Sequence, residues 1–188
     1  VDLSAFYLDI IKDRLYVSPP KSPERRDAQT VMAVILDTLV KIMAPVLPFT
    51  AEEIYAHMPP GKEKKESVHM ETMAAADSQW QDKDLAGKWT RILALRSEVT
   101  KALEAARKDK LIGHPLDAAV AIRLPDTELA GFVRDLDLPL SDVFIVSEAG
   151  LTDTLDTGAY QSKEIPGLEI GVKKAAGEKC ERCWRFSS

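Results

Sequence analysis

Cysteine is scarce in this sequence, with two residues in 188. Small secreted domains that depend on disulfide bonds need several cysteine pairs, so the composition argues against that class. The sequence also lacks a charged-then-apolar leader at its start and any run of about 18 apolar residues. These absences predict a cytoplasmic protein that does not span a membrane.

Sequence signatures of catalysis and of nucleotide binding are absent as well. There is no G-x-x-x-x-G-K-[ST] loop, no G-x-G-x-x-G after a strand and no H-E-x-x-H. The three histidines, His57, His69 and His114, have no ligand-like spacing and are expected to be surface or capping residues. Because no nucleophile, base and orienting group can be placed together, we expect no catalytic residue in this segment.

Charge, in contrast, is present in a clear pattern. The net charge is −5, yet residues 91–110 hold six bases and three acids, whereas residues 126–169 hold ten acids and two bases. From Ile170 onward the sequence is basic again. The local field, and not the net charge, decides where a polyanion can bind, so the two basic segments are candidate nucleic-acid surfaces. A solvated charged surface is the commoner meaning of such runs.

Apolar spacing predicts a helical first half, with helices over residues 3–15, about 24–44, about 50–58 and about 84–110. Asp2 or Ser4 is available to cap the first helix. Thr50 and Glu53 have the spacing of a capping box, flanked by Phe49 and Ile54 as a hydrophobic staple. The polar residues between Pro59 and Ser78 predict an exposed loop.

Two of these helices carry apolar faces that we expect to be buried. The face of the second helix comprises Ala28, Val31, Met32, Ile35, Leu36, Leu39, Ile42 and Met43. The stripe of the long helix comprises Leu85, Trp89, Ile92, Val99, Leu103 and Ala106. Together they predict that the long helix closes a bundle with the earlier helices, and that Gly113-His114-Pro115 ends it.

The apolar period changes to two after residue 116. Val120, Ile122 and Leu124 alternate as in a half-buried strand, and Leu168, Ile170 and Val172 do so again. Helical spacing returns over 129–136, and the apolar run 143–146 is a candidate buried strand. Thr152–Ser162 predicts a loop. The expected fold class is a mainly α-helical bundle followed by a small α+β module of β-α-β-β order.

The only two cysteines, Cys180 and Cys183, form a C-x-x-C near the end of the sequence. Such a turn presents two thiolates to one tetrahedral ion, but structural zinc takes four ligands. A redox pair and two incidental cysteines are alternative interpretations; half of a zinc site fits best, and it suggests that the chain was cut from a longer protein. Arg182 and Trp184 would then project from a metal-held loop, an arginine and tryptophan pair typical of single-stranded RNA contacts, unless Trp184 packs over the knuckle.

Several segments closely resemble bacterial isoleucyl-tRNA synthetases. Asp2–Tyr16 and Ser22–Arg26 resemble the start of their anticodon-binding domain, and Ala44–Tyr55 resembles a motif shared with the valine, leucine and methionine enzymes. Further matches are Glu66–His69, Ala94–Glu104, Phe144–Ser147 and Gly177–Trp184. The resemblance extends nearly from end to end and is weakest over 126–140 and 150–166.

The resemblance implies a non-catalytic fragment of an ATP-dependent ligase that charges isoleucine tRNA. It implies three parts: an anticodon-binding bundle (1–115), an α+β junction module (116–174) and an incomplete zinc knuckle (175–188). ATP and magnesium would bind only in the absent catalytic domain, and a second cysteine pair of the family would complete the zinc site of Cys180 and Cys183. Isoleucine tRNA is the expected partner of a monomer; neither DNA nor membrane is expected.

The predicted role of this segment is to grip the anticodon stem and loop. Arg182 and Trp184 are expected to read or stack on bases. Basic residues on the long helix and the tail are expected to neutralise phosphates: Arg96, Lys101, Arg107, Lys108, Lys110, Lys179 and Arg185. Two rival interpretations remain, the equivalent region of a valyl-tRNA synthetase and a zinc-ribbon adaptor that binds proteins.

Overall fold

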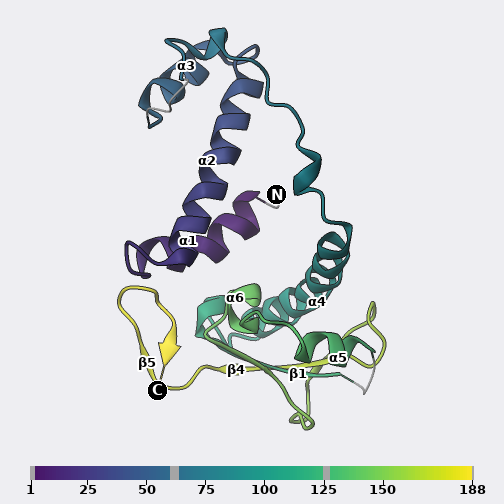
Figure 1. Ribbon diagram of the computed structural model, residues 1–188. Helices are drawn as coiled ribbons and strands as arrows, with labels where there is room; N and C mark the ends of the chain where they lie inside the picture. Colours follow the sequence, from purple (N-terminus) through teal and green to yellow (C-terminus); the bar gives the residue numbers. More distant parts are fainter. Residues whose placement is uncertain (1–2, 60–63, 125–127, 188) are drawn as a thin grey trace. The chain divides into compact units, whose positions relative to one another are not determined.

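The computed structural model describes residues 3–59, 64–124 and 128–187 (Figure 1). The chain divides into two compact units. The helical unit comprises Ile11–Gln81, and the sheet unit comprises the described residues up to Ile10 together with those from Asp82 onward. None of the described helices is long and apolar enough to cross a membrane.

The first helical segment begins with a π-helical turn, Leu3–Tyr7, and continues as α1, Leu8–Tyr16. The boundary between the two units falls within α1. Of the two predicted caps, Asp2 lies outside the described residues, and Ser4 lies inside the π-helical turn and therefore does not cap the helix.

In the helical unit, α2 spans Pro23–Met43 and α3 spans Pro48–His57. Ser22 caps α2, because its hydroxyl accepts a hydrogen bond from the amide of Arg25 at 3.3 Å, and Pro23 has the backbone angle that a first helical turn needs. Short 3₁₀ turns follow at Val68–Met70 and Ser78–Trp80 in an otherwise irregular segment. The core of this unit joins Val40, Ala44, Ala51, Tyr55 and Val68.

The capping box predicted at Thr50 is wrong. Helix α3 begins at Pro48, so Thr50 lies inside it, and Leu47 precedes it without a side-chain cap. Proline at the first helical position starts the helix two residues earlier than the hydroxyl would. The predicted staple is wrong as well, since Phe49 is 89% exposed.

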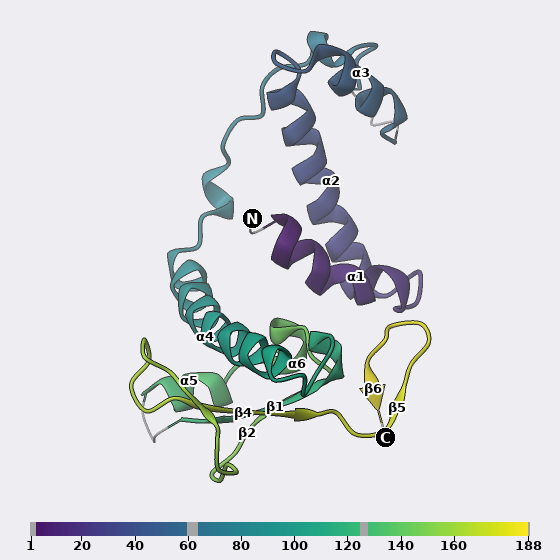
Figure 2. The ribbon, with the colours of Figure 1, turned by 180° about the vertical axis from the view of Figure 1, so that it is seen from behind.

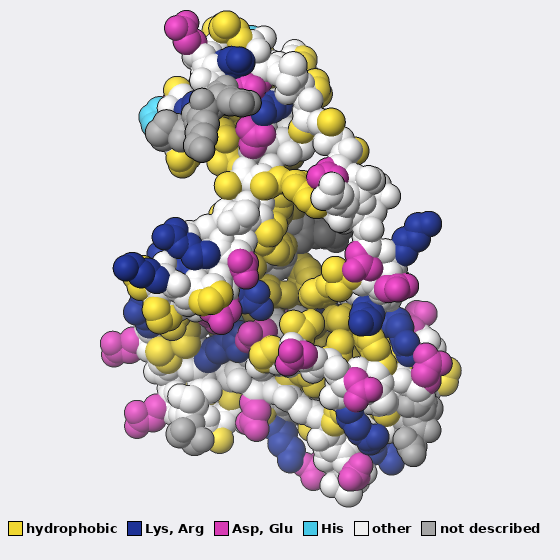
Figure 3. Space-filling model, in the orientation of Figure 1, with side chains coloured by type: hydrophobic (Ala, Val, Ile, Leu, Met, Phe, Trp, Pro, Cys, Tyr) yellow, Lys and Arg dark blue, Asp and Glu magenta, His cyan; other side chains and the backbone are white. Residues whose placement is uncertain are grey.

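The predicted buried face of α2 is buried only in part. Of the predicted face Ala28 is buried, and four residues are exposed: Val31, Leu36, Leu39 and Ile42. Val40, which is buried, was not part of the predicted face. Figure 3 shows hydrophobic side chains at the surface of the helical unit. Periodicity identifies an apolar face correctly, but it does not show whether a partner covers that face.

The sheet unit is built on the long helix α4, Lys83–Lys108, whose N-cap Asp82 accepts a hydrogen bond from the Leu85 amide at 2.8 Å. The helix is followed by β1 (Ala118–Arg123), α5 (Glu128–Arg134), α6 (Leu140–Phe144) and β2 (Glu148–Leu151). The last strands are β3 (Tyr160–Gln161), β4 (Glu169–Lys174), β5 (Glu178–Lys179) and β6 (Phe186–Ser187). The main sheet has the order β2-β1-β4-β3, and β5 and β6 form a separate hairpin.

The main sheet is mixed. Strand β1 pairs in parallel with β2 and antiparallel with β4, which places Val120 opposite Val172 and Ile122 opposite Ile170. Helices α4 and α6 lie over one face of this sheet (Figures 1 and 2). Their buried side chains, including Leu95 and Val99, share one core with those of β1 and β4.

This arrangement corrects the expected packing of α4. Its apolar stripe packs against the sheet and α6, except for Leu85, which is 49% exposed. Among the described residues up to Ile10, Phe6 makes an edge-to-face contact with Trp89, at 6.0 Å between ring centres. The two compact units consequently do not coincide with the three predicted parts, 1–115, 116–174 and 175–188. The division into these three parts stays a prediction. Helix α4 ends at Lys108, and the left-handed residue that ends it is Lys110, before Gly113 is reached.

The run 143–146 is buried as predicted, but it is not a strand. Val143 and Phe144 end α6, and Ile145 is left-handed with φ 58°. A short apolar run has no period that separates a buried strand from a buried helical turn. The loop predicted at Thr152–Ser162 contains the two-residue strand β3, and the hairpin β5–β6 was not expected.

The strands β1 and β4 and the helices α2 and α5 are confirmed close to their predicted positions. The predicted fold class, mainly helical with a small α+β part after it, is also confirmed.

Candidate nucleic-acid interface

The cysteine pair lies in the turn of the β5–β6 hairpin. The Cys180 amide donates to the Arg185 carbonyl at 2.8 Å, and the Trp184 amide donates to the Cys180 carbonyl at 2.9 Å. Both thiols are free. The pKa of the Cys180 thiol lies below its ordinary value because the backbone amides of Cys183 and Arg182 donate to its sulfur. The turn therefore favours a thiolate at Cys180.

Two sulfurs do not make a complete zinc site. Structural zinc takes four ligands, and the described residues contain no group of three or more His, Cys, Asp or Glu side chains able to hold a metal ion. The residues present supply half of a site at most, and Cys180 and Cys183 remain predicted ligands.

Among the histidines, His114 has the predicted capping role. Its Nδ1 accepts a hydrogen bond from the Leu116 amide at 3.2 Å, at the start of a 3₁₀ turn. His57 is exposed, and its ring nitrogen lies 2.8 Å from the Glu53 carbonyl oxygen one helical turn earlier.

Aromatic and basic side chains of the tail lie together. Trp184 is 58% exposed and has a left-handed backbone, φ 65°, which is unusual for so large a residue. The Lys179 ammonium lies 5.6 Å from the centre of the Trp184 ring and 5.9 Å from that of Phe186. Trp184 thus presents a large exposed ring beside a cation, as a base-stacking surface requires.

The two predicted arginines of the tail differ in their surroundings. Arg182 is exposed in the turn between the cysteines. Arg185 is half-buried and forms an ion pair with Asp142 at 2.8 Å, so it attaches the tail to α6.

Two of the predicted basic residues on α4 have partners within the protein. Arg96 donates from Nε to the Val143 carbonyl at 3.0 Å, its guanidinium lies 4.6 Å from the centre of the Phe6 ring, and burial lowers its pKa. The side chain of Lys101 is 47% exposed, but its ammonium pairs with the buried carboxylate of Glu98, and the hydrogen bond raises the pKa of Lys101. Arg96 is therefore part of the packing around α4, whereas Lys101 is an exposed residue held by an ion pair.

The remaining predicted bases are exposed at the C-terminal end of α4 and just after it. Arg107 pairs with Glu104 at 2.7 Å, whereas the ammonium groups of Lys108 and Lys110 have no hydrogen bond or ion pair with any described residue. Arg107 and Lys110 line a hollow of about 690 Å³ that also involves the end of β4 and the tail. We call it the sheet-unit hollow; its lining is Arg107, Lys110, Leu111, Ile112, Gly113, Asp117, Lys174, Ala175 and Phe186.

The structure therefore brings together only some of the predicted RNA-binding residues. Arg107 and Lys110 share a hollow with Phe186, whose ring also faces Lys179. The sequence had not singled out Lys174 or Phe186. The basic tail that begins at Ile170 was a signal for Lys174, but periodicity does not show that β4 ends beside the end of α4.

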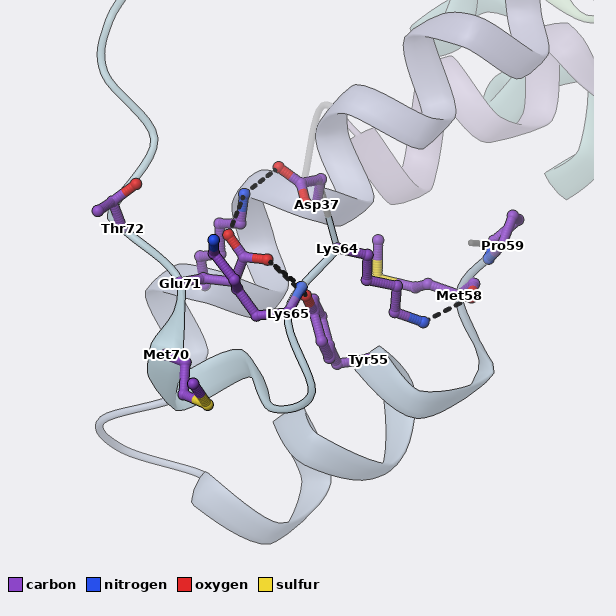
Figure 4. A pocket seen from close by; sticks show the side chains of 10 residues that line it. Asp37, Tyr55, Met58, Pro59, Lys64, Lys65, Met70, Glu71 and Thr72 are labelled. Atoms are coloured by element: carbon purple, nitrogen blue, oxygen red, sulfur yellow. Dashed lines mark hydrogen bonds and ion pairs between the residues drawn. The ribbon is translucent and has the colours of Figure 1, made fainter. Parts of the chain in front are cut away.

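A second hollow, of about 560 Å³, lies in the helical unit (Figure 4). Three of its charged side chains, Asp37, Lys41 and Glu71, are joined by ion pairs. The Tyr55 hydroxyl donates to Glu71 at 2.5 Å, and Lys41 lies 2.8 Å from Asp37 and 3.7 Å from Glu71. The Lys64 ammonium donates to the Met58 carbonyl at 2.8 Å.

The pKa values in this helical-unit hollow reflect that pairing. The hydrogen bond from Tyr55 holds the pKa of Glu71 below its ordinary value, and the hydrogen bond to Asp37 raises that of Lys41. Because the Lys65 amide also donates to Tyr55 and Glu71, the network attaches the segment after α3 to α2 and α3. On the face shown in Figure 3, basic and acidic side chains are likewise interspersed.

The match to a known family now gives these features a context. The family model described as the anticodon-binding domain of tRNA ligase matches residues 1–122. The chain therefore belongs to the family of anticodon-binding domains of tRNA ligases.

The similar curated proteins narrow this class further. The chain is 48% identical to the isoleucine–tRNA ligase of Geobacter sulfurreducens over 99% of its own length, and 49% identical to that of Desulfitobacterium hafniense over 100%. It is 48% identical to the isoleucine–tRNA ligase of Carboxydothermus hydrogenoformans over 100%. It spans 20% of the length of each of these relatives.

Proposed function

We propose that this chain is the region of an isoleucine–tRNA ligase that binds the anticodon stem and loop of isoleucine tRNA. The observation that carries the proposal is the identity of 48–49% to isoleucine–tRNA ligases over essentially the whole chain. In the longer protein, other parts would attach isoleucine to the tRNA with ATP and magnesium. This region would position the tRNA.

The chemistry at the end of the sheet unit supports an RNA partner. Trp184 is exposed beside Lys179, and further cations are exposed at the end of α4. Proteins bind single-stranded RNA with these two kinds of group, aromatic rings that stack on bases and cations that contact phosphates. The proposed contacts with bases are Arg182 and Trp184. Zinc at Cys180 and Cys183 would require two further ligands from elsewhere in the longer protein, which we propose to be a monomeric cytoplasmic enzyme.

The proposal is tested by filter binding of the 188-residue chain to isoleucine tRNA and to valine tRNA, at about 0.15 M salt. We expect tighter binding to isoleucine tRNA and a loss of affinity as the salt concentration rises. Equal affinity for both tRNAs would contradict the isoleucine assignment. A lack of binding to either would favour the rival interpretation, an adaptor that binds proteins.

The role of Trp184 is tested in the same assay. Replacing Trp184 by alanine removes a stacking ring, worth about 1–3 kcal/mol per base, so the dissociation constant should rise by about fivefold or more. Trp80→Ala is the control, because it removes an exposed ring from outside the hairpin. An unchanged affinity of Trp184→Ala would rule out stacking at this position.

A further inference from the structure

Lys110 has a backbone conformation that a lysine rarely adopts. Its φ is 58°, in the left-handed region. The Leu111 amide donates to the Ala106 carbonyl at 2.9 Å, and the Lys110 amide donates to the Arg107 carbonyl at 3.1 Å. These two bonds form a Schellman motif, in which the left-handed position is normally glycine. The chain thus has a lysine where glycine would fit the backbone without strain.

A strained residue suggests that its side chain is needed for another reason, and here that side chain lines the sheet-unit hollow. Lys174 reaches the same hollow from the end of β4. The ammonium group of neither lysine forms a hydrogen bond or an ion pair with any residue in the described ranges. Two lysines whose ammonium groups are unopposed therefore line one concave surface.

The acid in the hollow is already engaged. Asp117 accepts hydrogen bonds from the amides of Gly113 and His114, at 3.2 and 2.7 Å, and lies 3.9 Å from the ammonium of Lys179. Arg107 adds a third cation on the rim, although Glu104 pairs with it on the exposed surface of α4. The balance in the hollow is positive despite the partial negative charge at the end of α4.

The wall of the hollow is held in place. The Phe186 amide donates to the Ser147 hydroxyl oxygen at 2.7 Å, and that hydroxyl donates to the Leu116 carbonyl. The Ala175 amide donates to the Asp117 carbonyl at 2.8 Å. The tail is thereby attached to the segment between α4 and β1, so the two lysines are displayed from anchored backbone.

We propose that the sheet-unit hollow binds a backbone phosphate of the tRNA, held between the ammonium groups of Lys110 and Lys174. This inference rests on the proposed function and deepens it, because it assigns one phosphate site to two residues. It also explains the lysine at Lys110: glycine would relieve the backbone but remove one of the two charges that face the phosphate.

The test compares Lys110→Gly with the unsubstituted chain in tRNA binding and in thermal unfolding. Glycine suits the left-handed position, so the unfolding temperature should be equal or higher. The dissociation constant for isoleucine tRNA should rise about fivefold, as expected for the loss of one exposed ion pair. The slope of log affinity against log salt should become shallower by about 0.7–0.9. Lys174→Gln should weaken binding to a similar extent.

Lys88→Gln is the matched control, because it removes one exposed cation from α4 that neither lines the hollow nor lies at the basic end of the helix. It should change the affinity by less than about twofold. The inference is overturned if Lys110→Gly binds like the unsubstituted chain, or if Lys88→Gln weakens binding as much. If the unsubstituted chain binds no tRNA, the proposed function itself fails, so the two failures are distinguishable.

Discussion

The helical-unit hollow and the sheet-unit hollow are lined by similar numbers of cations but use them differently. In the helical-unit hollow, Lys41 faces Asp37 and Glu71, and the Lys64 ammonium is taken up by a backbone carbonyl. In the sheet-unit hollow, Lys110 and Lys174 face no carboxylate with which they pair among the described residues. The comparison teaches that the pairing of charges, and not their number, distinguishes a structural cluster from a binding surface.

The difference has an energetic consequence. Removing one member of a paired cluster leaves its partner without a hydrogen bond, so stability falls. Removing an unopposed surface cation breaks no internal contact, so the stability is kept and only the affinity for a ligand falls.

The largest effect on stability is expected at Glu98, a paired charge outside both hollows. Glu98→Gln weakens the bond from Lys101 and the 3.3 Å bond from the Tyr160 hydroxyl, inside a buried environment. We expect a loss of about 1–3 kcal/mol in the free energy of unfolding, measured with urea. The affinity for tRNA under folding conditions should stay within about twofold.

The same substitution has a pH signature. Burial raises the pKa of Glu98, but the bonds from Lys101, Ser162 and Tyr160 outweigh it and hold the pKa below its ordinary value. The stabilisation is therefore complete above the unfolded glutamate pKa of about 4.3 and is lost as the pH falls through the lowered pKa. This interpretation would be contradicted if Glu98→Gln lowered the free energy of unfolding by the same amount at pH 7 and well below pH 4.

A smaller loss of stability is expected in the helical-unit hollow. Tyr55→Phe removes the hydroxyl that donates to Glu71 and accepts from the Lys65 amide. The unfolding temperature should fall by a few degrees, up to about 4 °C, in a thermal scan monitored by circular dichroism. Binding of tRNA should not change. A tenfold loss of affinity with unchanged stability would assign this hollow to RNA binding as well.

The smallest effect is expected at Asp117, and it has the opposite sign. Asp117→Asn keeps an oxygen that can accept from the Gly113 and His114 amides, but it removes the negative charge from the sheet-unit hollow. Affinity for tRNA should rise by about twofold, measured at low salt where electrostatic effects are largest. A decrease in affinity, with the fold intact, would show that Asp117 itself contacts the RNA.

Much of the scaffold could be predicted from the sequence. Helices α2 and α4 are long and regular in their apolar spacing, and β1 and β4 alternate clearly, so local patterns suffice for them. The two-residue strands β3, β5 and β6 are too short to have a period. Helix α3 begins at Pro48, because proline favours the first helical position. The sequence pattern of a capping box at Thr50 and Glu53 therefore predicted the wrong start.

The candidate site was predictable only in part. Periodicity and composition pointed to the basic end of α4 and to the tail around Trp184. They could not show that Arg96 is engaged in packing, since Arg96 bonds to Val143, 47 residues away. Nor could they show the left-handed backbone at Lys110, which depends on how the segment after α4 turns toward β1. This backbone conformation and the place in the hollow separate Lys110 from the cations of α4.

The central claim, that unopposed cations of the sheet-unit hollow bind tRNA while the bonded lysines of the helical-unit hollow do not, is tested by two matched double variants. Lys110→Gln with Lys174→Gln and Lys41→Gln with Lys64→Gln each change the net charge from −5 to −7. In direct titrations with isoleucine tRNA, the first variant should lose about tenfold or more in affinity and the second less than about twofold. Equal losses in the two variants would contradict the account, because net charge alone would then explain the binding.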